Sequence, residues 1–339
     1  MNHADTAAKA PAPLLRALRE AKSFGIVGHV KPDADTLGSS LAIASLLRRI
    51  KPGRKIVLGN ANPIPEQLCF LPKWKTVIAP AQRSNLKGLD CAIYLECSNP
   101  ERSGGIAVPE DFRLTINIDH HKTGRGFADV NWINPRASSN AEQVFILFRA
   151  FGLAPTKEDA VCLYAGMVSD TGRFQYSLTS PFTHRVAAEL LEVGIPHTRI
   201  AERLFSTKTV EHLRLLARAV GTMQFPANGK LAVLRLSAKD FGEFDQHATQ
   251  TEDIVNYGLF PEHVEVAFFL KEEPFRGKGV ISVSFRSRGK VDVSVLAASF
   301  GGGGHRNAAG CEIRGLALEQ AEKILTERAA ALLSQAKLS

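Results

Sequence analysis

The chain has 339 residues, of which 45% are hydrophobic and 22% charged, and this balance excludes a largely disordered protein. Lysine and arginine outnumber aspartate and glutamate by 42 to 34, and the resulting net charge of +8 favours anionic partners such as nucleotides or phosphates. At roughly 150 residues per domain, the length predicts two domains.

The cysteines and the N-terminal residues indicate the compartment. Five cysteines without a C-x-x-C pair argue against a disulfide framework or a zinc ribbon and predict a cytoplasmic protein. Residues 1–13 are rich in Ala and Pro, which is typical of a loose tail rather than a signal peptide. The uncharged apolar runs are far shorter than the ~18 residues of a spanning helix, so we expect a soluble protein with no membrane partner.

The first half of the chain alternates short apolar runs with helical patterns. The apolar runs predict buried strands at residues 24–28, 55–59, 91–95 and 114–118. Apolar residues recur at helical spacing from Leu37 to Leu47 and from Val144 to Phe151, which predicts a helix in each range. Capping signals predict helix starts at Ser139 with Glu142, at Thr156 with Asp159 and at Ser180 before Pro181, with Gly194 ending the last of these helices. This alternation predicts an α/β domain with a parallel sheet and helices on both faces.

The pattern changes in the second half. A polar, Arg-rich stretch at 197–221 is typical of a helical connector, and residues 230–237, 264–270 and 280–286 are predicted strands. A closing helix is predicted at 318–333. We therefore divide the chain into a first domain at 14–196, a helical linker at 197–221 and a smaller mixed α/β domain at 222–339.

The first predicted strand is followed by a His and two carboxylates. His29, Asp33 and Asp35 lie within seven residues, at the strand end where ligands bind in open α/β sheets. Asp33 and Asp35 leave an extended backbone in the same direction, and their mutual repulsion calls for a nearby cation. Taken alone, the segment is equally well an Asp-rich turn that caps the next helix.

Two further predicted strands end in metal-ligand residue types. Glu96 follows one strand, Asp119, His120 and His121 follow the next, and Asp170 ends a predicted helix. Singly, such residues are also typical of solvated loops or of satisfied histidine pairs. Their repetition at three strand ends favours a metal centre, and mixed imidazole and carboxylate ligands suit Mn(II) or Fe(II) better than magnesium or calcium. The number of carboxylates suffices for two ions, which fits phosphoryl transfer.

A glycine run in the second half is the remaining candidate. Residues 301–304 are all glycine, and His305 and Arg306 follow at once. The N–H groups of the glycines could form an anion nest. Arg286, His305 and Arg306 could add positive charge to it. A glycine run is also typical of a flexible connection.

Together, these segments resemble the DHH phosphoesterase superfamily. The resemblance rests on residues 29–39, the Asp119-His120-His121 triplet, the turn that begins at Asp170, and residues 301–310, and it covers residues 14–335. More closely, the chain resembles the two-domain branch of nanoRNases and 3′-phosphoadenosine 5′-phosphate phosphatases, with a DHH-associated C-terminal domain. This implies a metal-binding catalytic domain, a substrate-binding domain and an active site in the cleft between them.

The resemblance also implies residue roles around two divalent ions, with manganese expected. It assigns the first ion to His29 and Asp33, the second to Asp35, His120 and Asp170, and a bridging role to Glu96, at a position usually occupied by Asp. His121 would meet the scissile phosphate and help to protonate the leaving group, while Asp119 orients the histidines. The implied substrate-binding residues are Arg286, Gly302, Gly303, Gly304, His305 and, from the loop that also holds Ser138 and Ser139, Asn140.

We thus expect a manganese-dependent phosphoesterase that hydrolyses short single-stranded oligonucleotides, dinucleotides and 3′-phosphoadenosine 5′-phosphate-like nucleotides. The alternatives are a non-catalytic nucleotide sensor of the same fold and a superfamily pyrophosphatase. The pyrophosphatase is disfavoured because its Ser-Arg-Lys-Lys-type signature is replaced here by residues 301–305, and a long processive exonuclease would need a further domain. The preferred substrate, the polarity of attack, the native metal and homodimer formation are left open by the sequence.

Overall fold

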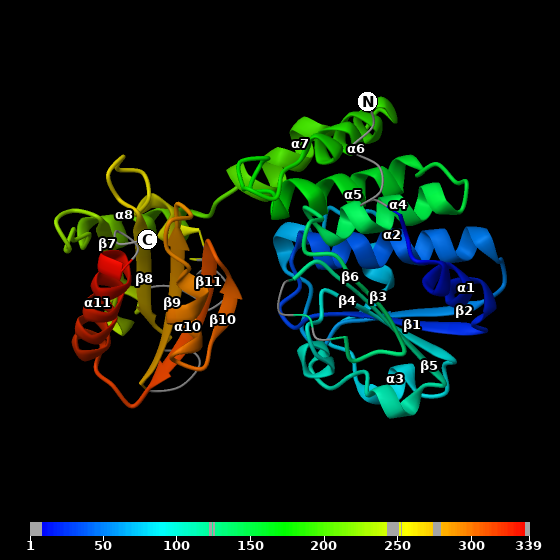
Figure 1. The fold of residues 1–339 in the computed structure, drawn as a ribbon, viewed down its shortest axis with the longest axis horizontal. Helices are drawn as coiled ribbons and strands as arrows, with labels where there is room; N and C mark the ends of the chain where they lie inside the picture. The colour runs from blue at the N-terminus through cyan, green and yellow to red at the C-terminus, as the bar shows by residue number, and fades with distance from the viewer. Residues whose placement is uncertain are drawn as a thin grey trace. The chain divides into compact units, whose positions relative to one another are not determined.

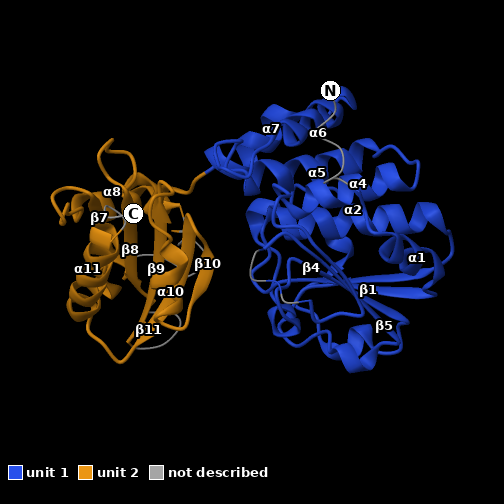
Figure 2. Cartoon of the chain, in the orientation of Figure 1, with its two compact units in different colours: residues 1–207 blue, residues 208–339 orange. Residues whose placement is uncertain are grey.

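The chain forms two compact units, Met1–Thr207 and Lys208–Ser339 (Figure 2). The structure is a computed structural model and describes residues 9–121, 124, 126–242, 251, 253–273 and 279–335. Over these residues, no helix combines the length and the apolar character needed to cross a bilayer.

Six strands of the first unit, within the part that the structure describes, form one parallel sheet in the order β3-β2-β1-β4-β5-β6 (Figure 1). They are β1 (Ser23–Gly28), β2 (Lys55–Gly59), β3 (Val77–Ile78), β4 (Cys91–Leu95), β5 (Leu114–Asp119) and β6 (Val130–Ile133). The two edge strands, β3 and β6, were not predicted because they are short and lack an apolar run. The chain order reverses between β1 and β4, and such a reversal is where open sheets bind ligands.

Helices cover both faces of this sheet, as predicted, but unevenly. The long helices α2, α4 and α5 lie together on one face, and the other face is covered by α3 and short turns (Figure 1). The helical elements are α1 (Ala12–Glu20), α2 (Ala34–Ile50), α3 (Arg83–Leu86), α4 (Asn140–Ala150), α5 (Lys157–Asp170), α6 (Pro181–Glu192) and α7 (His197–Ala201), with 3-10 turns η1 (Glu66–Leu68), η2 (Trp74–Thr76), η3 (Pro100–Ser103) and η4 (Pro109–Asp111).

The predicted caps start α4, α5 and α6, with one correction. Thr156 and Asp159 form a reciprocal capping box, and Ser180 caps α6. At α4 the Ser139 hydroxyl accepts the Glu142 N–H at 3.1 Å, but the expected return bond is not made. The Glu142 carboxylate is instead occupied by two hydroxyl donors, Ser138 and Thr183, each at 2.7 Å.

Two glycines let α2 and α5 approach each other closely. A Cβ on Gly38 would lie 2.3 Å from the Cys162 carbonyl oxygen, and one on Gly166 would lie 2.6 Å from Oδ1 of Asp35. Such separations are far below van der Waals contact, so glycine is required at both positions. The close packing brings the start of α2 beside α5, whose last residue is Asp170.

The segment expected to be one helical linker is interrupted. After α7, a π-helical turn η5 (Glu202–Ser206) ends in extended backbone at Thr207, and α8 (Val210–Gly221) starts anew. The break has a local cause, because the Thr209 hydroxyl accepts the His212 N–H at 3.1 Å and so begins a separate helix. The division between the two units falls between Thr207 and Lys208.

The second unit is a smaller mixed α/β fold, as predicted. Over its described residues, five strands follow the order β10-β11-β9-β8-β7, antiparallel except for β7 and β8. Helices α10 and α11 pack on one face, and α8 and α9 pack on the other. The elements are β7 (Leu231–Leu236), η6 (Ala238–Phe241), α9 (Ile254–Tyr257), β8 (Val266–Glu272), β9 (Val280–Ser287), α10 (Val293–Ala298), β10 (Gly303–His305), β11 (Ala308–Arg314) and α11 (Leu318–Gln335).

Candidate metal centre and active site

The residues that follow β1, β4 and β5 lie close together at one edge of the sheet. In the parallel register, Gly28 on β1 lies opposite Leu95 on β4, and Leu95 lies opposite Ile118 on β5. The residues just beyond these positions, among them His29 and Glu96, therefore lie side by side at the carboxyl edge of the sheet, next to the reversal of strand order. The topology thus explains why residues far apart in the sequence share one site.

The predicted ligand residues form overlapping clusters. The donor atoms of each cluster lie within 4.8 Å of one another, and the clusters are His29, Asp33 and Glu96; Asp35, Glu96, His120 and Asp170; and Glu96, His120 and His121. Glu96 belongs to all three. Its Oε2 lies 3.8 Å from Nε2 of His29, and its Oε1 lies 3.3 Å from Nε2 of His120.

The outer contacts of the cluster are equally short. Nε2 of His29 lies 3.4 Å from Oδ2 of Asp33, and Nε2 of His120 lies 3.0 Å from Oδ2 of Asp170. Imidazole and carboxylate donors at this spacing converge as ligands of a common cation do. The residues present therefore fit divalent cations.

Glu96 is held in place by its backbone and by Thr36, a residue that sequence reasoning did not single out. The backbone of Glu96 is left-handed (φ 57°), and its N–H donates to the Ile118 carbonyl at 3.0 Å. The Thr36 hydroxyl donates to the Glu96 carboxylate. Gly28 makes room for this contact, because a Cβ there would lie 2.0 Å from the Thr36 methyl group. The available signal was the position of Thr36 in the first turn of a predicted helix, directly after Asp35.

Asp35 is fully buried and is held by the start of α4. Its two carboxylate oxygens accept the backbone N–H groups of Asn140 at 2.6 Å and Ala141 at 2.8 Å, and the Ser39 hydroxyl contacts Oδ1 at 3.2 Å. The partial positive charge of a helix N-terminus stabilises such a carboxylate. Asn140, which was expected to face substrate, contributes its backbone here, and its own side chain is buried without a hydrogen-bond partner.

The pair Asp119 and His121 extends the site. Oδ1 of Asp119 lies 2.7 Å from Nδ1 of His121 and also accepts the backbone N–H of His121 at 3.0 Å. Asp119 is fully buried, whereas the His121 side chain is 22% exposed. Although burial alone raises the pKa of Asp119, its hydrogen bond with His121 lowers that pKa overall. The carboxylate thus fixes the orientation of the His121 ring.

The electrostatics of the cluster call for cations. Burial and repulsion from Asp170 raise the pKa of Asp35 to about 7, and burial and repulsion from Asp35 raise the pKa of Glu96 well above its usual range. Burial opposes protonation of His120, but its hydrogen bonds with Asp170 and Glu96 raise its pKa overall. Carboxylates held this close in a buried site are stabilised when a divalent ion neutralises them.

The second unit aligns two predicted substrate residues. Arg286 on β9 lies opposite Ala308 on β11, which lies opposite His305 on β10, so the side chains of Arg286 and His305 share one face of the sheet. Nε of Arg286 donates to Oδ1 of Asn256 at 3.1 Å. The small Ala308 lies between these two basic residues in the strand register.

The predicted anion nest is wrong for two of its glycines. The N–H groups of Gly301 and Gly302 donate at 3.0 Å to the carbonyls of Ala298 and Ala297, where they complete the end of α10. Gly303 and Gly304 lie in the edge strand β10 rather than in a loop. A Cβ on Gly302 would lie 2.2 Å from the carbonyl oxygen of Gly310, so close packing also requires glycine at position 302.

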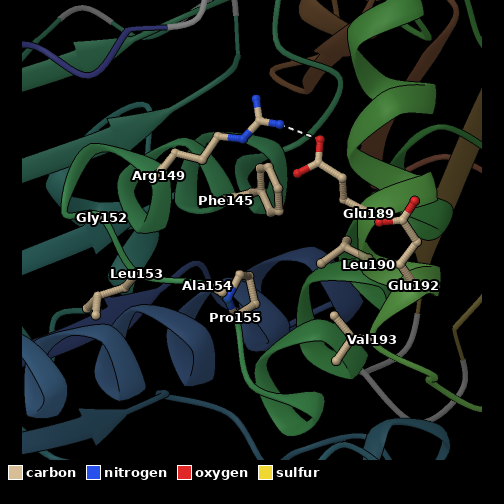
Figure 3. A pocket seen from close by; sticks show the side chains of 10 residues that line it. All are labelled: Phe145, Arg149, Gly152, Leu153, Ala154, Pro155, Glu189, Leu190, Glu192 and Val193. Atoms are coloured by element: carbon tan, nitrogen blue, oxygen red, sulfur yellow. Dashed lines mark hydrogen bonds and ion pairs between the residues drawn. The ribbon is translucent and has the colours of Figure 1, made fainter.

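A separate pocket of about 530 Å³ lies between the end of α4 and α6 (Figure 3). Arg149 and Glu189 form an ion pair at its rim, and Phe145 and Leu190 are among its apolar walls. None of the predicted site residues lines this pocket.

Comparison with known proteins places the chain in a family. Residues 23–167 match the N-terminal domain of the DHH family, and residues 228–334 match the DHHA1 domain. The bifunctional oligoribonuclease and PAP phosphatase NrnA of Thermus thermophilus is 35% identical over 88% of this chain and 87% of that protein. The NrnA of Bacillus subtilis is 28% identical over 88% of this chain and 91% of that protein.

A solved structure extends this similarity to the fold. An exopolyphosphatase-related protein from Bacteroides fragilis superposes with a TM-score of 0.86 and 27% identity, over 98% of this chain and 100% of that one. The strand-end ligand cluster, the two domain matches and the identity with NrnA all agree. The chain therefore belongs to the DHH phosphoesterase family, in the branch that carries a DHHA1 domain, and is a hydrolase of phosphodiester or phosphate bonds.

Proposed function

We propose that this hydrolase uses two divalent ions, natively manganese, to cleave short oligoribonucleotides, dinucleotides and 3′-phosphoadenosine 5′-phosphate-like nucleotides. The observation that carries the proposal is the pair of donor clusters that share Glu96. His29, Asp33 and Glu96 would hold one ion. The other would be held by Asp35, Glu96, His120 and Asp170.

Divalent ions at such a centre supply Lewis-acid activation of the phosphate and of the attacking water. The protein's part is to position these ions and to manage protons. Buried Asp35, tied to the start of α4, cannot swing away from the cluster, and Thr36 limits rotation of Glu96. A rigid set of ligands lowers the reorganisation that the reaction requires.

His121 is our candidate for the proton donor to the leaving oxygen. It is partly exposed, whereas its neighbour His120 is buried within the cluster. Asp119 holds Nδ1 of His121 and orients the ring, as an acidic partner does in other acid–base pairs. This arrangement supports a role in protonation.

The second unit supports binding of a nucleotide phosphate. Arg286 and His305 offer charge-assisted hydrogen bonds from one sheet face. The NrnA relatives are named for oligoribonuclease and PAP phosphatase activities, and both reactions concern phosphorylated nucleotides. The net charge of +8 favours such anions. All five cysteines are free thiols, which supports a reducing, cytoplasmic setting.

The test is release of mononucleotides from a labelled dinucleotide. We expect turnover with manganese, loss of turnover after chelation and recovery when manganese is returned. Removing one member of a catalytic unit costs several orders of magnitude, so His120→Ala should be nearly inactive while remaining folded. Dinucleotide binding without turnover would identify a nucleotide sensor instead. Phosphate release from pyrophosphate alone would identify a pyrophosphatase.

A further inference from the structure

The second unit displays an aromatic pair near its basic residues. Among the described residues, Phe260 is the most exposed of the large hydrophobic side chains, at 72%. Its ring centroid lies 5.0 Å from that of Tyr257, and the two planes are tilted by 39°. A phenyl ring left in water forgoes the free energy that its burial would supply. An exposed ring that also contacts a second aromatic ring is a candidate binding surface for a planar ligand.

The loop that carries Phe260 is a fixed structure. The Arg288 guanidinium donates to the carbonyls of Leu259, Pro261 and Val264, the last at 2.8 Å from Nε. These acceptors lie on both sides of Phe260 in the sequence. One side chain thus fastens the loop at three points, and the exposed ring is held in place rather than carried on a loose turn.

The helix that bears Tyr257 also bears a hydrogen-bond partner of Arg286, one of the predicted phosphate-binding residues. Asn256, the residue before Tyr257, accepts the hydrogen bond from Nε of Arg286 at 3.1 Å. Helix α9, which bears both Asn256 and Tyr257, packs against β8 and β9, and the Phe260 N–H returns to the Tyr257 carbonyl at 3.2 Å. Tyr257 and Phe260 therefore lie one and four residues after Asn256, the hydrogen-bond partner of Arg286.

Cationic side chains and an exposed aromatic ring on one unit suit one ligand chemistry. Arg and His bind phosphate oxygens, while an aromatic face accepts a nucleobase by stacking. Proteins that bind single strands combine these two features, and stacking tolerates any base because every base has a π-face. The neighbouring groups thus match the two ends of a nucleotide.

We propose that Phe260, backed by Tyr257, is a stacking platform for a nucleobase of the substrate. The inference rests on the proposed function, since it takes the phosphate to bind at Arg286 and His305. It assigns Phe260 a binding role, outside the chemistry of the metal centre. Base identity is not selected by such a platform, so short substrates of any sequence fit it.

The kinetic test compares a dinucleotide with two analogues, each of which lacks the base at one position. We expect Phe260→Ala to raise KM for the dinucleotide about tenfold with little change in kcat, as expected for lost stacking. Phe260→Trp should retain the wild-type KM. For the analogue that lacks the stacked base, the wild type and Phe260→Ala should have equal KM values.

Phe225→Ala is the matched control. Phe225 is also exposed, at 45%, but its ring pairs with His263 rather than with Tyr257. This variant should behave as the wild type does on all three substrates. An equal rise in KM for Phe260→Ala on the dinucleotide and on both abasic analogues would overturn the proposal, as would no rise at all.

A spectroscopic arm separates this proposal from the proposed function. The indole introduced by Phe260→Trp should be quenched when adenosine monophosphate stacks on it, and the wild type, which holds two tryptophans, gives the background. If dinucleotides are not cleaved but quenching occurs, the proposed function fails and the platform stands. If dinucleotides are cleaved without added quenching in Phe260→Trp, the platform is refuted and the proposed function stands.

Discussion

The hydroxyl of Thr36, on the first turn of α2, donates a hydrogen bond to the carboxylate of Glu96, just past the end of β4. This contact joins the helix that bears Asp35 to the acidic residue common to all three donor clusters. It therefore couples the geometry of one half of the candidate metal centre to the other.

Replacing Thr36 with Val keeps the shape of the buried side chain but removes its donor. Loss of a partner that orients a metal ligand typically weakens metal affinity about 10- to 100-fold. We expect that loss in manganese titrations of Thr36→Val. Ser103→Ala removes a buried hydroxyl that bonds only to backbone carbonyls and should leave the affinity unchanged. Equal affinities in Thr36→Val and the wild type would show that Thr36 does not orient Glu96.

Glu96 itself should tolerate a change of length better than a loss of charge. Glu96→Asp retains a carboxylate, so it should keep substantial activity with an altered preference among divalent ions. Glu96→Gln cannot neutralise the ions and should lose most of its turnover. Steady-state rates with manganese, magnesium and cobalt measure both effects. Equal activity in the two variants would place Glu96 outside the metal shell.

Gly166→Ala should lower both the stability of the protein and its affinity for manganese. The added Cβ would lie 2.6 Å from Oδ1 of Asp35 and 3.0 Å from the Cβ of Ala141, so α5 or Asp35 must shift. Overpacking of this kind costs about 1–3 kcal/mol of stability, and manganese affinity should fall with it. Gly221→Ala is the matched control, because a Cβ there meets no atom within 4 Å. Urea unfolding and metal titration of both variants test the prediction, which fails if the two behave alike.

The two units should divide chemistry from substrate binding. Removing one charge-assisted contact costs about 1.5–3 kcal/mol, which is about a tenfold to hundredfold loss of substrate capture. Arg286→Ala and His305→Ala should show this loss as a raised KM for a dinucleotide, with unchanged metal content. Bis-p-nitrophenyl phosphate carries no nucleotide, and both variants should hydrolyse it nearly as the wild type does. The same loss on both substrates would assign these residues to the chemistry.

Asp90 provides a pH dependence away from the metal centre. Its carboxylate accepts from Nε of Arg113 at 2.6 Å and from the Lys22 N–H at 2.7 Å, and the bond with Arg113 is the main cause that lowers its pKa to about 2. Because this lies below the unfolded value of ~3.9, the contribution to stability is complete above that value and is lost as the pH falls through about 2.

The size of this contribution is limited, because Arg113 is 61% exposed and water screens the pair, so we expect about 1 kcal/mol. Asp90→Asn should therefore be less stable than the wild type at pH 7 by about that amount. Unfolding midpoints in urea should converge as the pH falls from about 5 toward 2. A gap that stays constant with pH would rule out ionisation of Asp90 as its cause.

The sequence predicted the first unit's sheet and the grouping of its ligands for a physical reason. In a parallel sheet, the residues after neighbouring strands meet at one edge, so His29, Glu96 and His120 converge once the strands are identified. The contribution of Thr36 and the burial of the Asn140 side chain depend on helix packing, which local patterns do not record.

The glycine run of the second unit was harder to predict because its structure depends on strand pairing and on backbone hydrogen bonds to other segments. A run of glycines has no side-chain pattern, so nothing local distinguishes the edge strand Gly303–His305 from a loop. The N–H groups of Gly301 and Gly302 are taken by α10, a neighbour whose end lies a few residues earlier. Likewise, the start of a new helix at Thr209 depends on one hydroxyl within an otherwise helical stretch.

The ligand residues are spread from His29 to Asp170, and this spacing sets the order of assembly during synthesis. A growing chain that has completed β1, β4 and β5 still lacks the last carboxylate, which arrives at the end of α5. Until α5 docks against α2, Asp35 shares this cluster with Glu96 and His120 alone. Because unfolded chains rarely hold a preformed metal site, we expect divalent ions to bind this chain only once the first unit has folded.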